Sequence, residues 1–268
     1  MSQTYSGKTV VVTGAGRGIG RAIAEAFAAT GAKVVVGART LGYGEETVAA
    51  IRRSGGEATL CSVDVTDKSQ VEALVATAVK IYGSLDIAVH SAADIPAGGL
   101  DVSEEALDRG LASIIKAPIW LARAARSHLR QSKDGGRLIF ISSVAGPRTI
   151  SPGLGAYCIS KGGLETFIRS TALELARENI TVNGIEPGLI ASARQLESMG
   201  AEGVEAVGAS TPVGRAGTPE EVAHVALFLA SPMSGYITGT NIIIDGGFVL
   251  SHSDLADYGV DSRQLSRD

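Results

Sequence analysis

Short runs of apolar, often β-branched residues alternate with longer segments of helical periodicity along almost the whole chain. Such runs predict strands, and seven of them occur, at residues 9–13, 33–37, 58–63, 85–90, 137–142, 181–185 and 241–244. Runs such as 34–36 and 242–244 are apolar at every position, which is typical of strands that are covered on both faces. Because strands that alternate with helices form βαβ units, the pattern predicts an α/β fold: a doubly wound, seven-stranded parallel sheet with helices on both faces.

The segment before the last predicted strand has two contrasting parts. Thr218, Pro219 and Glu221 predict a helix start, with an N-cap, a proline at the first helical position and a capping box. Residues 189–217 are the least regular part of the chain and show only weak helical patterning. Because they follow the carboxyl end of a predicted strand, where doubly wound sheets bind ligands, we expect a substrate loop or lid there. The alternative is a surface excursion without a special role.

Composition and charge narrow the class of protein. Of the 268 residues 45% are hydrophobic, the net charge is −4 and lysine and arginine do not cluster, so we expect no nucleic-acid partner. Two cysteines are too few for a disulfide framework, and neither they nor the four histidines show the spacing of a metal site. We expect a cytoplasmic protein without a membrane partner, because neither a signal peptide nor a long apolar stretch is seen. No linker divides the chain, which favours one domain over 1–250 and a tail over 251–268.

Glycine is the compositional outlier, with 34 residues, about 13% of the chain against roughly 7% in average proteins. Part of the excess lies in TGAGRGIG, residues 13–20, between the first predicted strand and an alanine-rich helix. At such a junction, backbone N–H groups and the helix dipole hold a pyrophosphate, and we therefore expect a dinucleotide site. The alternative is a tight turn packed against the sheet. The loop residues expected to bind the cofactor are Gly14, Arg17, Gly18, Ile19 and Gly20.

The end of the second strand bears on the choice between NAD(H) and NADP(H). An acidic side chain there would accept hydrogen bonds from the ribose of NAD and repel a 2′-phosphate. The run 36–40 has no carboxylate and instead contains Arg39, while Arg17 in the glycine loop adds a second cation. Either arginine alone could be a solvated surface residue. The two arginines and the missing carboxylate together favour NADP(H) over NAD(H).

A tyrosine and a lysine share one face of a predicted helix. Tyr157 and Lys161 are four positions apart, and the later apolar positions of the helix fall on the same stripe, so the lysine is expected to be buried. A nearby cation in a partly desolvated site lowers the pKa of a phenol from its ordinary value of about 10. Ser143 follows the fifth strand and places a hydroxyl at the same edge of the sheet. These three residues are the candidate catalytic set; a snorkelling lysine and a turn-capping serine are the alternatives.

Taken together, these motifs resemble the short-chain dehydrogenase/reductase family over residues 7–248. TGAGRGIG, Asp64-Val65, ISSVAG, YCISK, NGIEPG at 183–188 and GYITGTNIIIDGG near the end all occur in family order. The resemblance implies a Rossmann-type fold, a nicotinamide cofactor and a homo-oligomer, either a tetramer or a dimer. It also implies hydride transfer between NADP(H) and a small-molecule ketone or secondary alcohol.

The resemblance assigns roles to individual residues. Tyr157 would be the general acid/base, Lys161 would lower its pKa and bind the nicotinamide ribose, and Ser143 would orient the substrate. The remaining cofactor contacts implied are Asp64, Val65, Ser91, Pro187, Gly188 and Ile190.

Two departures from the family pattern concern polar positions. Ser91-Ala92-Ala93 stands where the family has Asn-Ala-Gly, a mild change because serine retains some of the hydrogen bonding. Ile114 stands where the family has a fourth catalytic residue, an asparagine that holds a water for proton relay. Isoleucine forms no side-chain hydrogen bond, which leaves its own backbone carbonyl or the neighbouring Ser113 as the alternatives.

These departures keep two other functions open beside the oxidoreductase: a non-catalytic NADP(H)-sensing or scaffold protein, and a redox-neutral enzyme that uses the tyrosine as a base. The candidate pocket segments are 94–99, 147–154 and 189–210, whose small and weakly charged residues favour a neutral, fairly apolar substrate. Arg148 is expected to be a solvated surface residue, with a contact to an acidic substrate as the alternative, and the small Cys158 is expected to fill the core.

Overall fold

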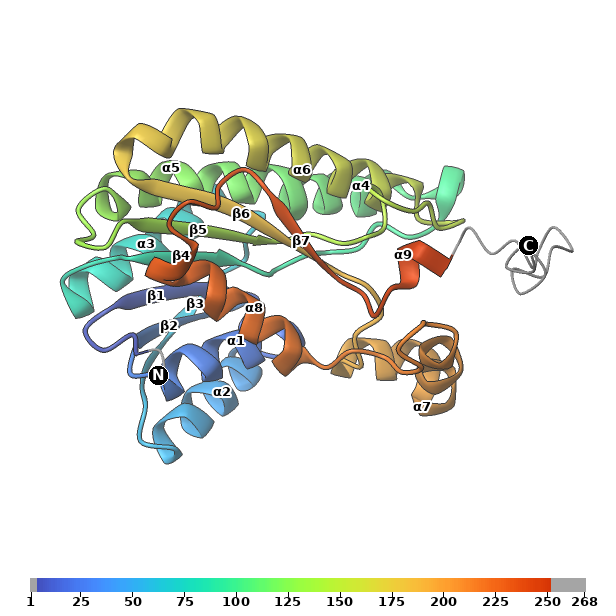
Figure 1. Ribbon diagram of the computed structural model, residues 1–268, viewed down its shortest axis with the longest axis horizontal. Helices are drawn as coiled ribbons and strands as arrows, with labels where there is room; N and C mark the ends of the chain where they lie inside the picture. Colours follow the sequence, from blue (N-terminus) through green and yellow to red (C-terminus); the bar gives the residue numbers. More distant parts are fainter. Residues whose placement is uncertain (1–3, 252–268) are drawn as a thin grey trace, which may run out of the picture.

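The computed structural model describes residues 4–251, so the expected tail lies, apart from Ser251, outside the described residues. All the strands pair in parallel in one sheet of the order β3-β2-β1-β4-β5-β6-β7 (Figure 1). The strands are β1 Thr9–Thr13, β2 Lys33–Ala38, β3 Glu57–Ser62, β4 Ile87–His90, β5 Gly136–Ile141, β6 Ile180–Pro187 and β7 Asn241–Ile244. Each lies within two residues of a predicted strand, and the predicted fold class is confirmed.

Helices cover both faces of the sheet (Figure 1). On one face lie α1 Gly18–Ala29, α2 Leu41–Arg53 and α8 Pro219–Ala230. On the other lie α3 Lys68–Tyr82, α4 Glu104–Leu111, α5 Ala117–Leu129 and α6 Gly155–Leu175. The predicted capping box of α8 is present.

Alternate residues of one strand enter different layers of the core. Val10 and Val12 pack with α1 and α8, whereas Val11 between them packs with α3 and α5. Since successive strand residues point to opposite faces, a strand with helices on both sides must be apolar at every position. The apolar runs of the sequence are therefore a direct consequence of the double layer of helices.

The direction in which successive strands are added to the sheet reverses between β1 and β4. The strands that follow β1 lie toward one edge, and those that follow β4 lie toward the other. A doubly wound sheet opens a crevice at the carboxyl ends of its strands at this point. The glycine loop after β1 and the segment after β4 therefore face each other across the position where a ligand binds.

Helix α7 Ala193–Ala209 and the short α9 Phe248–Ser251 extend beyond the carboxyl ends of the strands (Figure 1). The expectation of an irregular segment over 189–217 is wrong for most of its length, because α7 is 17 residues long. Glycine disfavours a helix interior, which explains the weak pattern, and the helix is interrupted at Gly200, where φ is 71°. The Ser192 side chain caps the helix by accepting a hydrogen bond from the Gln195 N–H.

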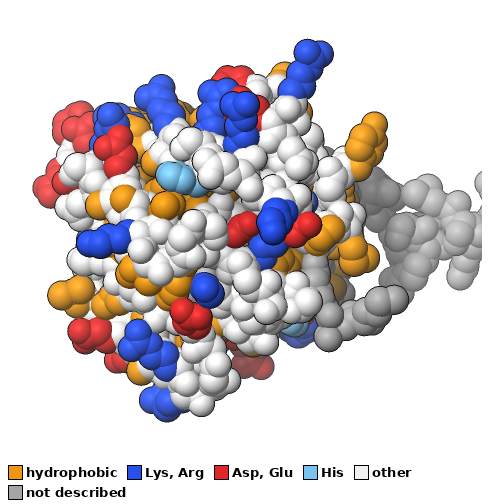
Figure 2. Space-filling model, turned by 90° about the vertical axis from the view of Figure 1, so that its left-hand side faces the viewer, with side chains coloured by type: hydrophobic (Ala, Val, Ile, Leu, Met, Phe, Trp, Pro, Cys, Tyr) orange, Lys and Arg blue, Asp and Glu red, His pale blue; other side chains and the backbone are white. Residues whose placement is uncertain are grey.

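Shorter elements join the helices. Three are 3₁₀ turns, Gly99–Asp101, Ala176–Glu178 and Pro232–Ser234, and one is a π-helical turn, Ala112–Lys116, between α4 and α5. Within residues 4–251 no helix combines the length and apolar character needed to span a membrane. Figure 2 shows the face at the amino ends of the strands, where side chains of both charges are interspersed.

Candidate functional site

A cleft of about 1100 Å³ runs along the carboxyl ends of the strands. Its walls come from the loops after β1, β2, β4 and β5, from the first turns of α6, and from the segment between β6 and α7. Every residue that the sequence singled out for catalysis or cofactor binding lines this cleft: Gly14, Arg17, Gly18, Ile19, Gly20, Arg39, Asp64, Val65, Ser91, Ser143, Tyr157, Lys161, Pro187, Gly188 and Ile190. The structure thus brings the whole predicted set into one continuous space.

The glycine loop leaves room for a ligand at the start of α1. Gly14 has φ +67°, and a Cβ there would lie 2.8 Å from the Ala92 backbone; a Cβ on Gly20 would lie 2.3 Å from the Gly14 carbonyl oxygen. Only glycine fits either position. At the N-cap of α1, Arg17 forms no side-chain cap, and no acidic residue lies in the first turn. The N–H groups and the positive end of the helix dipole therefore face the cleft, an arrangement that fits the pyrophosphate of a dinucleotide.

Two buried threonines hold this loop from below. The Thr47 hydroxyl, on α2, donates to the carbonyl oxygens of Ala15 at 3.0 Å and Gly16 at 3.2 Å. Thr13 Oγ1, at the end of β1, accepts from the Ser91 N–H at 3.1 Å, which joins the loops after β1 and β4. The loop is positioned by the fold and not by the ligand.

Ion pairs connect exposed side chains at the end of the cleft that lies away from Ser143, Tyr157 and Lys161, which we call the far end. Arg39 contacts Asp94 at 3.2 Å, and Arg109 contacts both Asp94 at 3.0 Å and Asp64 at 3.4 Å. The pKa of Asp64 is below its ordinary value: burial acts to raise it, but hydrogen bonds from Thr66 and the charge of Arg109 together outweigh burial. Arg17 also has a carboxylate partner, because it lies 2.8 Å from Glu197 on α7. Arg39 and Arg17, the two cations predicted to meet a 2′-phosphate, are thus both paired with carboxylates.

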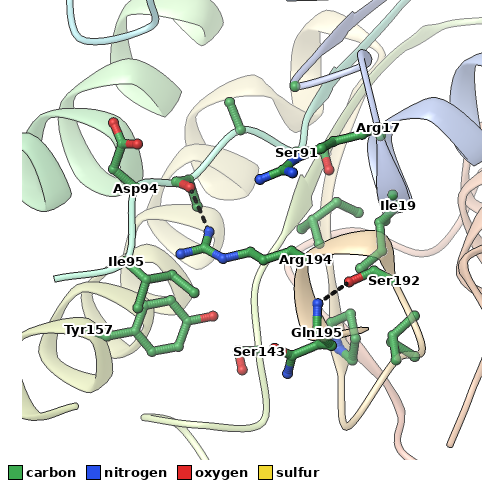
Figure 3. A pocket seen from close by; sticks show the side chains of 18 of the residues that line it. Arg17, Ile19, Ser91, Asp94, Ile95, Ser143, Tyr157, Ser192, Arg194 and Gln195 are labelled. Atoms are coloured by element: carbon green, nitrogen blue, oxygen red, sulfur yellow. Dashed lines mark hydrogen bonds between the residues drawn. The ribbon is translucent and has the colours of Figure 1, made fainter. Parts of the chain in front are cut away.

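The catalytic candidates lie at the other end. Ser143 is two residues beyond β5, and its Oγ accepts from the Ala145 N–H at 3.1 Å, which fixes the serine. Tyr157 lies in the first turn of α6 and faces the cleft near Ser143 (Figure 3). Burial raises the pKa of the Tyr157 phenol, while a hydrogen bond with Ser143 and the charge of Arg194 offset part of that rise.

Lys161 lies one helical turn after Tyr157 and is 3% exposed. Its Nζ donates to the Ile141 carbonyl oxygen at 2.8 Å and lies 5.6 Å from the centroid of the Tyr157 ring. Burial lowers the pKa of this ammonium to about 7. The predicted burial of the lysine on the helix face is confirmed, and the nearby Cys158 is a core residue, as expected.

Ile114 does not line the cleft. It is 1% exposed within the π-helical turn, where it packs in the core. The neighbouring Ser113 hydroxyl accepts from the Asp94 N–H and donates to the Gly110 carbonyl oxygen, so it supports the floor of the cleft and does not face it. Neither the Ile114 side chain nor the Ser113 hydroxyl is therefore directed into the cleft, where the asparagine of the family pattern would hold a water.

His90, at the end of β4, is a buried residue whose role the sequence did not reveal. Its Nε2 lies 2.9 Å from the Ser113 carbonyl oxygen and its Nδ1 lies 3.0 Å from Thr13 Oγ1. A carbonyl only accepts, so Nε2 carries the proton and Nδ1 accepts from the threonine. Burial and, to a smaller extent, the charge of Lys161 lower the pKa of His90 to about 4. His90 therefore acts as a neutral brace between β1 and the π-helical turn.

Two arginines differ from what the sequence suggested. Arg148 is not a freely solvated residue, because it donates to the fully buried Glu186 at 2.9 Å and lies 3.6 Å from Glu165. Arg194, in the first turn of α7, crosses the cleft to the Ala93 carbonyl oxygen at 3.3 Å (Figure 3). The pattern Ser-x-x-Gln at 192–195 is a helix-start signal that would have placed Arg194 at the mouth of the cleft.

Comparison with known proteins connects this cleft to characterised enzymes. A family model described as enoyl-(acyl carrier protein) reductase matches residues 14–249. The chain is 37% identical over 260 residues to a tetrahydroxynaphthalene reductase of Pyricularia oryzae, covering 92% of this chain and 91% of that protein. It is 33% identical over 260 residues to glucose 1-dehydrogenase 2 of Bacillus subtilis, covering 95% and 100%.

A similar structure has also been solved. 7 Alpha-hydroxysteroid dehydrogenase complexed with NADH and 7-oxo glycochenodeoxycholic acid matches with a TM-score of 0.86 and 30% sequence identity, covering 92% of this chain and 98% of that chain. Reductases and dehydrogenases thus resemble this chain in sequence and in fold over nearly their full lengths.

Proposed function

The chain belongs to the short-chain dehydrogenase/reductase family, and we propose that it transfers a hydride between NADP(H) and a ketone or secondary alcohol. Membership makes it an oxidoreductase with a nicotinamide cofactor and a small-molecule substrate. The observation that carries the proposal is that Ser143, Tyr157 and Lys161 line the same cleft as the glycine loop.

The three residues divide the work on the substrate. The nicotinamide cofactor, when bound, supplies or accepts the hydride. Tyr157 donates its phenolic proton to the carbonyl oxygen during reduction and takes a proton from the alcohol during oxidation. Ser143 is held by the Ala145 N–H and orients the same oxygen. Protonated Lys161 lies beside the phenol ring and stabilises the phenolate left after proton transfer.

The preference for NADP(H) rests on the exposed end of the cleft. Arg39 and Arg17 line it, and no carboxylate lies at the end of β2. A phosphate monoester carries more charge than a carboxylate and accepts several hydrogen bonds, so it competes well for an exposed guanidinium. The 2′-phosphate would replace Asp94 as the partner of Arg39 and Glu197 as the partner of Arg17.

We also propose a homo-oligomer, a dimer or a tetramer. Two apolar side chains of α6 are exposed, Ile159 at 74% and Leu173 at 85%, and Ile243 is exposed on the edge strand β7. Exposed apolar residues on a helix and an unpaired strand edge are typical of surfaces covered by another chain. Light scattering coupled to size exclusion would report the mass of the assembly.

The test of the function is turnover of NADPH with a panel of ketones, and of NADP⁺ with the corresponding alcohols. We expect the wild type to react with part of the panel, and Tyr157→Phe to lose about 10³-fold in kcat while its Kd for NADPH changes less than threefold. Wild-type protein that binds NADPH but converts no ketone and no alcohol would contradict the proposal. NADPH-dependent capture of a partner that persists in Lys161→Ala would then favour the sensing or scaffold function.

A further inference from the structure

Arg194 is a cation directed into the reacting end of the cleft. It comes from α7, extends toward Ile95 and the Tyr157 hydroxyl, and ends at the Ala93 carbonyl oxygen (Figure 3). In the described part of the chain this is the one hydrogen bond of the Arg194 side chain; it is 3.3 Å long and uses one of the five N–H donors of the guanidinium. Within the part of the chain that the structure describes, no carboxylate lies within ion-pair distance of Arg194. Among residues 4–251, most of its donors are therefore without a partner and can bind a ligand.

Apart from the buried Lys161, the other charged side chains that line the cleft are already paired. Arg17 pairs with Glu197, while Asp94 and Asp64 together meet Arg39 and Arg109. Glu202 and Glu205, which make α7 acidic in sequence, do not line the cleft. Among the described residues, pairing thus leaves Arg194 and the buried Lys161 as the cations of the cleft without a carboxylate partner, and of these two Arg194 is the exposed one.

The guanidinium of Arg194 ends at Ala93, next to Asp94, and its charge also reaches the reacting atoms. The positive charge of Arg194 acts on the Tyr157 phenol and offsets part of the effect of burial on its pKa. Gln195, the next residue, extends toward Ser143 (Figure 3). Arg194 and Gln195 therefore flank the place where the substrate oxygen lies between Ser143 and Tyr157.

The rest of this end is largely apolar. The lining side chains with apolar character are Ile95, Ala97, Val144, Leu154, Leu189 and Phe248. Such walls accept a hydrocarbon body, and one guanidinium among them provides one strong anion contact. A planar carboxylate matches the fork of an arginine with two parallel hydrogen bonds.

We propose that the substrate is an oxo acid with an apolar body, and that Arg194 binds its carboxylate while its ketone lies at Tyr157. This rests on the proposed function and specifies its substrate class. It differs from the neutral substrate that the sequence favoured, because the sequence did not show which carboxylates pair with which arginines.

The experiment compares each keto acid with its own methyl ester, so that only the charge changes. The probes are 4-oxopentanoate, 6-oxoheptanoate and 4-acetylbenzoate, which vary the spacing between ketone and carboxylate, each with its ester and NADPH. For at least one spacing we expect the acid to exceed the ester in kcat/KM by about tenfold or more. We expect Arg194→Gln to reduce kcat/KM for that acid by about 10- to 100-fold and for its ester by less than threefold.

Matched variants separate charge from fold and from cofactor binding. Arg194→Lys keeps the charge but not the fork, and is expected to retain part of the preference. Arg53→Gln removes an exposed arginine of α2 that does not line the cleft, and is expected to leave the preference unchanged. A wild type that reduces esters as well as acids at every spacing, or a preference that survives in Arg194→Gln, would overturn the inference. So would a loss of NADPH affinity in Arg194→Gln as large as its loss of activity with acid and ester alike, because Arg194 would then hold the cofactor.

Failure of the proposed function would be recognised separately. If the wild type binds NADPH but reduces neither acids nor esters, the function fails, and calorimetric titration of 4-acetylbenzoate into the NADP⁺-bound protein decides the inference. Binding that Arg194→Gln abolishes and that the ester does not show would support a carboxylate site. Absence of binding, or equal binding by both variants, would overturn it.

Discussion

The two ends of the cleft are built in opposite ways. At the catalytic end Lys161 and His90 are buried and their partners are neutral: Lys161 bonds a carbonyl oxygen of β5, and His90 bonds the Ser113 carbonyl oxygen. At the far end the groups are exposed and their partners are charged, as in the pairs of Arg39 with Asp94 and of Arg17 with Glu197.

The difference lies in what each end has to do. Burial raises or lowers a pKa strongly, and geometry fixed by the sheet orients groups before the substrate arrives. Exposed ion pairs contribute about 0–1 kcal/mol each, so a ligand phosphate can replace a carboxylate partner at little cost. In the proposed function one end prepares proton transfer, and the other would exchange partners when the cofactor binds. Four predictions test this contrast.

The largest effect is expected at Lys161. Lys161→Met keeps an unbranched side chain of similar length but removes the charge beside Tyr157, so the phenolate loses its stabilisation. We expect kcat with NADPH to fall by at least about 100-fold and the fold to be retained, as judged by circular dichroism. A variant that keeps a tenth or more of wild-type kcat would show that this buried charge is not needed for proton transfer.

The same residue gives stability a pH dependence. Its folded pKa of about 7 lies below the ordinary value of 10.5, so between these limits the unfolded chain binds a proton that the folded chain lacks. The free energy of unfolding must therefore rise with pH in that window, by about 2 kcal/mol from pH 7 to pH 9. Urea unfolding of the cofactor-free wild type and of Lys161→Met at both pH values measures the difference. If the free energy of unfolding changed equally with pH in the two proteins, Lys161 would not be desolvated in the folded state.

At the exposed end the expected effects are smaller and selective. Arg39→Gln removes a cation proposed to meet the 2′-phosphate, and we expect Kd for NADPH to rise roughly tenfold while Kd for NADH stays within twofold. Fluorescence titration with both cofactors measures this, with Arg53→Gln as the matched control. Equal weakening for the two cofactors would assign Arg39 to the fold and not to the phosphate.

The smallest effect is expected at Glu197. Glu197→Gln releases Arg17 from its carboxylate partner, so the 2′-phosphate of NADPH no longer has to displace that carboxylate. NADPH should therefore bind about two- to threefold more tightly at low salt. The gain should disappear near 1 M salt, where exposed charges are screened. Weaker binding of NADPH by this variant would mean that Glu197 supports the cleft in some other way.

The two ends of the cleft also differ in how much of each could be predicted from the sequence. Buried strands produce continuous apolar runs, and the glycine loop requires glycine for steric reasons, so both were recognisable from local pattern. The exposed ion pairs join residues far apart in the chain, as Arg17 and Glu197 do, and no local pattern records them. His90 was missed for the same reason, since its partners Thr13 and Ser113 become neighbours only after the sheet forms.

Helix α7 shows where local signals conflict. Its glycines lower helix propensity, but the cap at Ser192 starts the helix all the same. The direction of Arg194 depends on that start, so the most informative side chain for the substrate lay in the segment whose secondary structure the pattern described least well.

The π-helical turn at Ala112–Lys116 interrupts the α-helical repeat between α4 and α5. A π turn closes its hydrogen bonds over five residues instead of four, so it accommodates one residue more than the α-helical turn it replaces, and that residue changes the rotational phase between α4 and α5 by about 100°. Residues on the two sides of the turn therefore cannot be placed on one continuous helical wheel. Ile114 occupies the point at which that phase changes, so its side chain faces the core, and the helix supports the catalytic end through the backbone carbonyl of Ser113.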